Sequence, residues 1–160
     1  MDNGLIGQAK TFILSDIKRE LARADASEKL LGKIFLRLAG VSRGGGNFVA
    51  ALSLLAYTEY AGRLKMNDFS DGNSRKNFDE FFGDLGAGYK QLLTQHKIYK
   101  IFRCGLAHEY YVKKDCTIYM RSSKPLTAGI GHDGKNFFFV VEKYYEDFKI
   151  AFEALCTKLV

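Results

Sequence analysis

Residues 101–114 read IFRCGLAHEYYVKK, and this stretch is the most informative part of the sequence. They continue the apolar spacing of a helix that we expect to run from Tyr89 to about Tyr110. Within that apolar stretch stand an arginine, Arg103, and a histidine, His108, five positions apart. Burying a charged group without a partner is costly, so these two side chains need either a structural partner or a function.

The composition describes one folded domain with a mild preference for polyanions. The chain has 160 residues, 47% of them hydrophobic, and a single proline, which argues against a disordered or low-complexity protein. The net charge of +6 favours partners such as nucleic acid. Three widely spaced cysteines, with no CxxC pair, predict reduced thiols rather than disulfides.

Apolar residues recur at helical spacing through the first half of the chain. This spacing predicts helices over 5–24, 28–39, 48–65 and 74–85. Asp25 and Glu28 are spaced as a capping box for the second of these helices. Asn47 and Ser74 are placed to cap the third and the fourth.

The hydrophobic pattern changes after residue 115. CTIYMR (116–121) and KNFFFVVE (135–142) are rich in β-branched and aromatic residues, and the loop between them contains a proline and an Asp-Gly pair. This pattern predicts a two-stranded hairpin over about 116–142. A last amphipathic helix follows over about 143–158. The expected fold is therefore a mainly α helical bundle, one domain over 1–160, with a small β-hairpin before the C-terminal helix.

Several functional classes find no support in the sequence. The apolar stretch at 48–57 is too short to span a membrane, and the N-terminus has no basic start, so we expect a cytoplasmic protein. The loop SRGGGN (42–47) precedes a helix but lacks the Gly-Lys-Ser/Thr of a nucleotide-binding loop. Cys104 and His108 form the only closely spaced pair of metal-ligand residues, so we expect no metal and no other cofactor.

The segment RCGLAH (103–108) resembles a motif of a known protein superfamily. It resembles the motif of an arginine, four to six residues and a histidine in the HEPN superfamily of helical-bundle proteins. Many members are metal-independent RNases of toxin–antitoxin, abortive-infection and CRISPR systems. The wider YKIFRCGLAHEYYVKK (99–114) looks like the final-helix signature of bacterial members, and AYTEYAG (56–62) is similar to their helix with an acid and a glycine. The resemblance covers about residues 48–114.

The resemblance implies a metal-independent endoribonuclease in which Arg103 and His108 are catalytic. Cleavage would begin with attack of the RNA 2′-OH on the adjacent phosphate. Histidine suits the proton transfer, and arginine suits the charge that develops on the phosphate. The residues expected to bind RNA or to support the site are Glu59, Tyr99, Cys104, Lys113 and Lys114.

The spacing of the motif also predicts a homodimer. On an α-helix five residues turn through about 140°, so Arg103 and His108 would diverge. HEPN RNases place this motif at a two-fold interface, which implies that each chain supplies an arginine and a histidine to a shared groove. Gly105 and Ala107 are small enough to let a second backbone approach. A cognate antitoxin protein is a further expected partner.

Two other readings remain open. Many active members have asparagine or another polar residue directly after the motif arginine, where this chain has Cys104. This departure favours a non-catalytic HEPN-like dimer that binds RNA or a protein partner. In a purely structural bundle, Arg103 would pair with an acid such as Glu59, and His108 would be hydrogen-bonded in the core. A binding test with RNA separates the structural bundle from the other two.

Overall fold

The chain forms a helical bundle with a small sheet, as described by a computed structural model. The described residues are 3–28, 32, 34, 37–40, 46–109, 112, 115–123 and 125–159. In chain order the elements are α1 (Asn3–Glu28), α3 (Asn47–Met66), the 3-10 helix η1 (Asp71–Asn73), α4 (Ser74–Asp84), α5 (Ala87–Gln95), the π-helix η2 (Tyr99–Glu109), β1 (Cys116–Tyr119), β2 (Ile130–His132), β3 (Phe137–Val140) and α6 (Val141–Leu159). The prediction of a mainly helical fold with a small β element before the last helix is confirmed.

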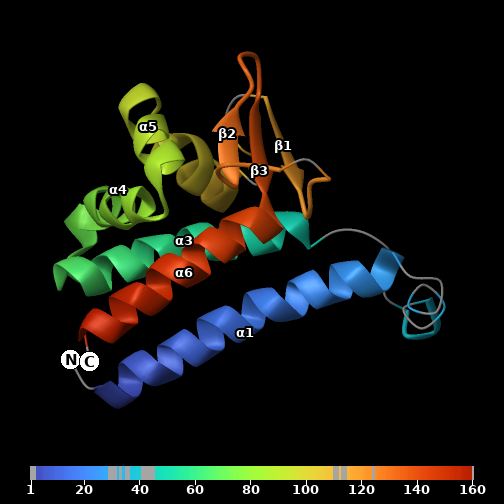
Figure 1. The fold of residues 1–160 in the computed structure, drawn as a ribbon, viewed down its shortest axis with the longest axis horizontal. Helices are drawn as coiled ribbons and strands as arrows, with labels where there is room; N and C mark the ends of the chain where they lie inside the picture. Colours follow the sequence, from blue (N-terminus) through green and yellow to red (C-terminus); the bar gives the residue numbers. More distant parts are fainter. Residues whose placement is uncertain are drawn as a thin grey trace.

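Three long helices lie side by side and form the base of the molecule (Figure 1). Helix α1 packs on α6 and α3, and α6 packs on α3. Helix α4 covers another side of α3 and makes the most extensive helix–helix contact of the fold. The sheet stands at the end of the bundle where α6 begins, next to α5 (Figure 1). Helix α3 is apolar on nearly all sides and is central, as its sequence predicts.

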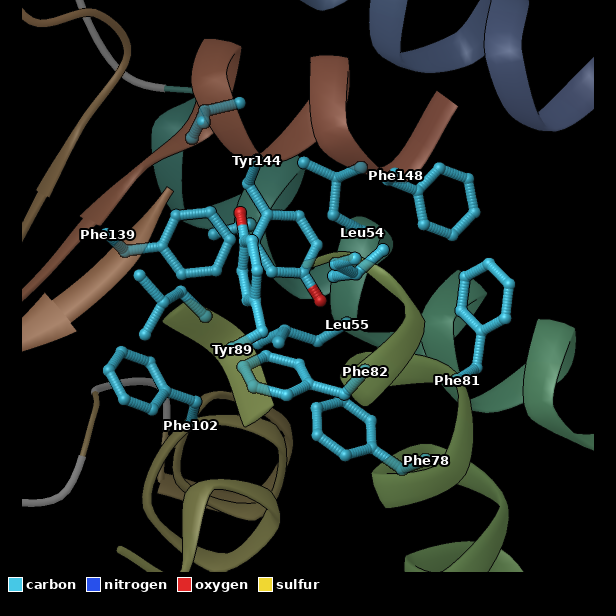
Figure 2. Close-up of a cluster of buried hydrophobic side chains, with 14 of the residues drawn as sticks. Leu54, Leu55, Phe78, Phe81, Phe82, Tyr89, Phe102, Phe139, Tyr144 and Phe148 are labelled. Atoms are coloured by element: carbon cyan, nitrogen blue, oxygen red, sulfur yellow. The ribbon is translucent and has the colours of Figure 1, made fainter. Parts of the chain in front are cut away.

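Aromatic side chains from four helices and the sheet form the centre of the core (Figure 2). Tyr89 and Tyr144 lie in its middle, with Phe82 and Phe139 against them. Each buried phenol has a partner: the hydroxyl of Tyr89 donates to Asp147 (2.7 Å), and that of Tyr144 is hydrogen-bonded to Thr58 (2.8 Å). The centre of the core therefore pairs both phenol hydroxyls while it buries large rings.

The predicted two-stranded hairpin over 116–142 is wrong in its pairing. The sheet has three strands in the order β1-β3-β2, with β1 parallel to β3 and β2 antiparallel to β3. The Asp-Gly pair of the predicted loop forms a tight turn that joins β2 to β3. Gly134 adopts a positive φ of 98° there, and Asp133 accepts hydrogen bonds from the N–H groups of Lys135 and Asn136.

The predicted helix caps are also wrong. Helix α1 continues through Glu28, so no helix begins at a capping box there. Asn47 is the first residue of α3, and its amide donates to the carbonyl of Ile118 in β1 (2.8 Å). Ser74 is the first residue of α4, and its hydroxyl accepts from Arg63 (2.8 Å). Both side chains are engaged by distant parts of the chain rather than by their own helix.

One predicted helix is divided, and half of another lies outside the described residues. The helix expected over 89–110 consists of α5 and η2, because His96 between them has an extended backbone (φ −141°, ψ 150°). In the helix expected over 28–39, residues 29–31, 33, 35 and 36 lie outside the described residues. Residues 32, 34, 37 and 38 are helical, residue 28 ends α1, and residue 39 is in a turn. Over the described ranges, no helix is long and apolar enough to cross a membrane.

We expect Gly62→Ala to destabilise the protein severely. Gly62 is buried where α3 crosses α4, and a Cβ atom there would overlap the backbone carbonyl of Asn77. The two helices would have to separate, at a cost of more than about 3 kcal/mol in the free energy of unfolding, measured by urea denaturation. Gly7→Ala is the control, because Gly7 lies in α1 with open space around it, and it should stabilise by about 0.5–1 kcal/mol. Equal stability of Gly62→Ala and wild type would contradict this packing.

Candidate active site on the π-helix

A buried carboxylate lies between two arginines from different elements. Glu59 of α3 has a side chain only 10% exposed. Its Oε1 accepts from Nη2 of Arg63 (3.1 Å), and its Oε2 accepts from Nε of Arg103 on η2 (3.2 Å). Breaking a buried pair leaves an uncompensated charge, so Glu59 holds both guanidiniums in place. The pairing of Arg103 with Glu59, which the alternative of a purely structural bundle predicted, is present.

Two neutral hydroxyls complete this cluster. The Ser74 hydroxyl accepts from Arg63 (2.8 Å), which connects the cluster to the start of α4. The Tyr99 hydroxyl lies 3.5 Å from Oε2 of Glu59 and donates to it. Burial first, and then the charge of Glu59, raise the pKa of Tyr99, so this phenol stays protonated. Three of the predicted site residues, Glu59, Tyr99 and Arg103, thus lie together.

The helix that carries the motif is a π-helix, which changes the geometry of Arg103 and His108. In a π-helix the N–H of residue i+5 bonds to the carbonyl of residue i, so residues five apart diverge much less around the axis than they do on an α-helix. Helix η2 spans Tyr99–Glu109 and includes both residues. The expectation that five positions turn the two side chains apart is therefore wrong, because it assumed an α-helix.

Helix η2 has one buried side and one open side. Ile101, Phe102, Gly105 and Leu106 are buried, whereas Arg103 and Cys104 are half-buried and His108 is exposed. No hydrogen bond or ion pair of the His108 imidazole occurs within the described part of the chain. The alternative in which His108 is hydrogen-bonded in the core is therefore wrong, and the imidazole is accessible to a ligand.

The two small residues of the motif differ in exposure. Gly105 is buried inside its own chain, where η2 packs against α3. A second backbone could not approach it without opening the core, so its small size serves packing within the chain. Ala107 is exposed and remains available. Lys113 and Lys114 lie outside the described residues.

The cysteines and histidines of the described ranges form no metal-binding cluster. No group of three potential ligands is brought together there. All three cysteines are free thiols, and Cys156 is buried. Burial raises the pKa of the Cys116 thiol to about 12, which suppresses its reactive thiolate form. Cys104 lies close enough to Tyr99 to influence the pKa of the Tyr99 phenol.

Sequence reasoning missed Arg63 and Ser74. A signal for Arg63 was present, because Glu59 and Arg63 are four apart on one helix, which is the spacing of a helical ion pair. Nothing in the sequence indicated Ser74, since its contact depends on how closely α4 approaches α3. Gly62 permits that approach.

Comparison of the whole chain with protein-family models, curated proteins and solved structures finds no match. The functional interpretation therefore depends on the residues and their geometry.

We expect Glu59→Gln to lower the free energy of unfolding by about 2–4 kcal/mol, because it leaves two half-buried guanidiniums without their carboxylate. Chemical denaturation measures this loss. Glu80→Gln is the matched control: Glu80 lies 3.8 Å from Lys65, and its side chain is 46% exposed. That surface change should stay within about 0.5 kcal/mol. A Glu59→Gln variant as stable as the control would show that the pair is not structural.

Proposed function

We propose that the chain is a HEPN-like, metal-independent endoribonuclease of the toxin or defence type that works in the cytoplasm. The observation that carries the proposal is the state of Arg103. Its guanidinium is held at Nε by the buried Glu59, while Nη1 and Nη2 have no partner among the described residues. An arginine that is held through its Nε and has two unpaired terminal nitrogens can donate two parallel hydrogen bonds to a phosphate.

His108 supplies the proton transfer in this proposal. It lies five residues after Arg103 on the same π-helix, and its imidazole is exposed. In its neutral form an imidazole can accept the proton of an RNA 2′-OH. The 2′ oxygen then bonds to phosphorus, and the 5′ oxygen leaves and takes a proton from water. The products are a 2′,3′-cyclic phosphate and a 5′-OH.

In this proposal, Arg103 and His108 of one chain act together. Residues five apart on a π-helix diverge much less around the axis than they do on an α-helix, and Gly105 is buried within its own chain. The two sequence-based reasons for a composite groove between subunits are thereby weakened. The homodimer remains part of the proposal, with one Arg103–His108 pair on each chain. A cognate antitoxin would act by covering this surface.

The alternative is a non-catalytic HEPN-like dimer that binds RNA or a protein partner. It is favoured by the structural role of Arg103. The ion pair of Arg103 with Glu59 connects η2 to α3, and this contact explains an arginine at position 103 without catalysis. Cys104 after the arginine supports the same alternative. The cleavage assay separates the two.

We expect chelator-treated protein to cleave labelled single-stranded RNA and to leave DNA intact, because the attacking group is the 2′-OH. His108→Ala should lose about 10²–10⁴-fold in rate, as is typical when a general base is removed. Arg103→Ala should lose a similar factor. His132→Ala is the control, since His132 is exposed on β2, and it should cleave like wild type. Full activity of His108→Ala would exclude its catalytic role, and RNA binding without cleavage by wild type would favour the alternative.

A heterodimer test separates one-chain sites from a shared groove. Light scattering should give a dimer at micromolar concentration, and a monomer would contradict the homodimer. Wild type paired through two affinity tags with the double variant Arg103→Ala/His108→Ala should keep about half the activity of the wild-type dimer, because one complete pair survives. Loss of nearly all activity would show that the groove is composite.

A further inference from the structure

The cluster of Glu59, Arg63 and Arg103 has a net positive charge. Arg63 and Arg103 contribute two positive charges, and Glu59 contributes one negative charge. Both guanidiniums are largely removed from water, with side chains 21% and 23% exposed. One positive charge is therefore in excess at a site where water solvates it only in part.

The remaining contacts of the two arginines are neutral. Arg63 donates to the Ser74 hydroxyl and lies 3.5 Å from the carbonyl of Phe69. The nearby Tyr99 phenol is protonated, because burial and Glu59 raise its pKa. Within the described ranges, Glu59 is the only ionised partner of either arginine. Because a charge held partly out of water is costly unless it is paired, an external anion would stabilise this arrangement.

Both arginines also keep hydrogen-bond donors for such an anion. Arg103 uses only Nε, which leaves its two terminal nitrogens unpaired among the described residues. Arg63 uses Nη2 for both Glu59 and Ser74, and its Nη1 contact with Phe69 is too long to be a strong hydrogen bond. The guanidinium is planar and always charged, which matches the tetrahedral oxygens of phosphate better than those of smaller anions.

We propose that Arg63 and Arg103 together bind one phosphate group, so that Arg63 is a second phosphate ligand of the site. The ligand in the cell is a backbone phosphate of RNA, and in this respect the inference rests on the proposed function. Glu59 lies between the two guanidiniums and sets their separation before the phosphate arrives.

The test uses inorganic phosphate and the melting temperature of the full chain. Phosphate replaces chloride at constant ionic strength, and a ligand of the native state raises the melting temperature as its concentration passes its dissociation constant. We expect wild type to show this rise. Arg63→Gln and Arg103→Gln should each weaken phosphate binding about 10- to 100-fold, as the loss of a charge-assisted hydrogen bond does.

Three further variants separate binding from stability. Arg63→Lys keeps the charge but loses the planar guanidinium, so it should bind phosphate with an affinity between those of wild type and Arg63→Gln. It replaces Arg63→Gln in the test if that variant folds poorly. Ser74→Ala removes a neutral partner that holds Arg63, so it should weaken phosphate binding less than Arg63→Gln does. Arg75→Gln is the charge control: Arg75 pairs with Asp79 in α4, its side chain is 65% exposed, and its loss should leave the response unchanged.

The outcomes distinguish this inference from the proposed function. A wild type with no phosphate-dependent rise, or an Arg63→Gln variant that binds phosphate like wild type, would overturn the inference. RNA cleavage is measured on the same preparations. Wild type that binds phosphate through both arginines but cleaves no RNA would overturn the nuclease and leave the phosphate site standing. RNA cleavage by wild type, combined with an Arg63→Gln variant that binds phosphate like wild type, would overturn the phosphate site and leave the nuclease standing.

Discussion

The carboxylate of Glu59 has to be paired because it is buried, and this constraint organises the region around it. It accepts from Arg63 on its own helix and from Arg103 on η2, and thereby connects α3 to the helix that carries the motif. Arg63 extends the connection to Ser74 at the start of α4. Gly62, one residue before Arg63, lets the α4 backbone approach closely enough for that contact. A single charge thus fixes the relative positions of three elements.

The same constraint decides which part of Arg103 can act on a ligand. The arginine is held by its Nε and is half-buried, and its two terminal nitrogens have no partner among the described residues. His108 has no comparable restraint within the described residues and is exposed. In the nuclease that we propose, the arginine would be the positioned charge and the exposed histidine the proton carrier.

Periodicity predicts elements better than it predicts their partners. The helical spacing of apolar residues correctly located α1, α3, α4 and α6, because burial of one face is what stabilises each of them. The enrichment in β-branched and aromatic residues located β1 and β3 but missed β2, which lies in the predicted loop. It also did not give the pairing, in which β3 lies between β2 and a parallel β1. Asn47 and Ser74 looked like caps, yet their side chains contact residues 71 and 11 positions away. Such long-range contacts are invisible in a local pattern.

The candidate site was predictable to a similar extent. The motif drew attention to Arg103 and His108, and the pairing of Arg103 with Glu59 followed from the cost of buried charge. The π-helical form of η2 could not be foreseen, because the two helix types share the same residue preferences over so short a stretch. The sequence therefore placed Arg103 and His108 on diverging sides and led to a groove between subunits.

A site formed within one chain depends most directly on the hydrogen bond made by the backbone N–H of His108. Scalar coupling across hydrogen bonds, measured by NMR on isotope-labelled protein, identifies the carbonyl to which each amide donates. The π-helix predicts coupling from the amide nitrogen of His108 to the carbonyl carbon of Arg103, five residues earlier. Coupling to the carbonyl of Cys104, four residues earlier, would show an α-helix. That result would turn Arg103 and His108 apart and contradict a site formed within one chain.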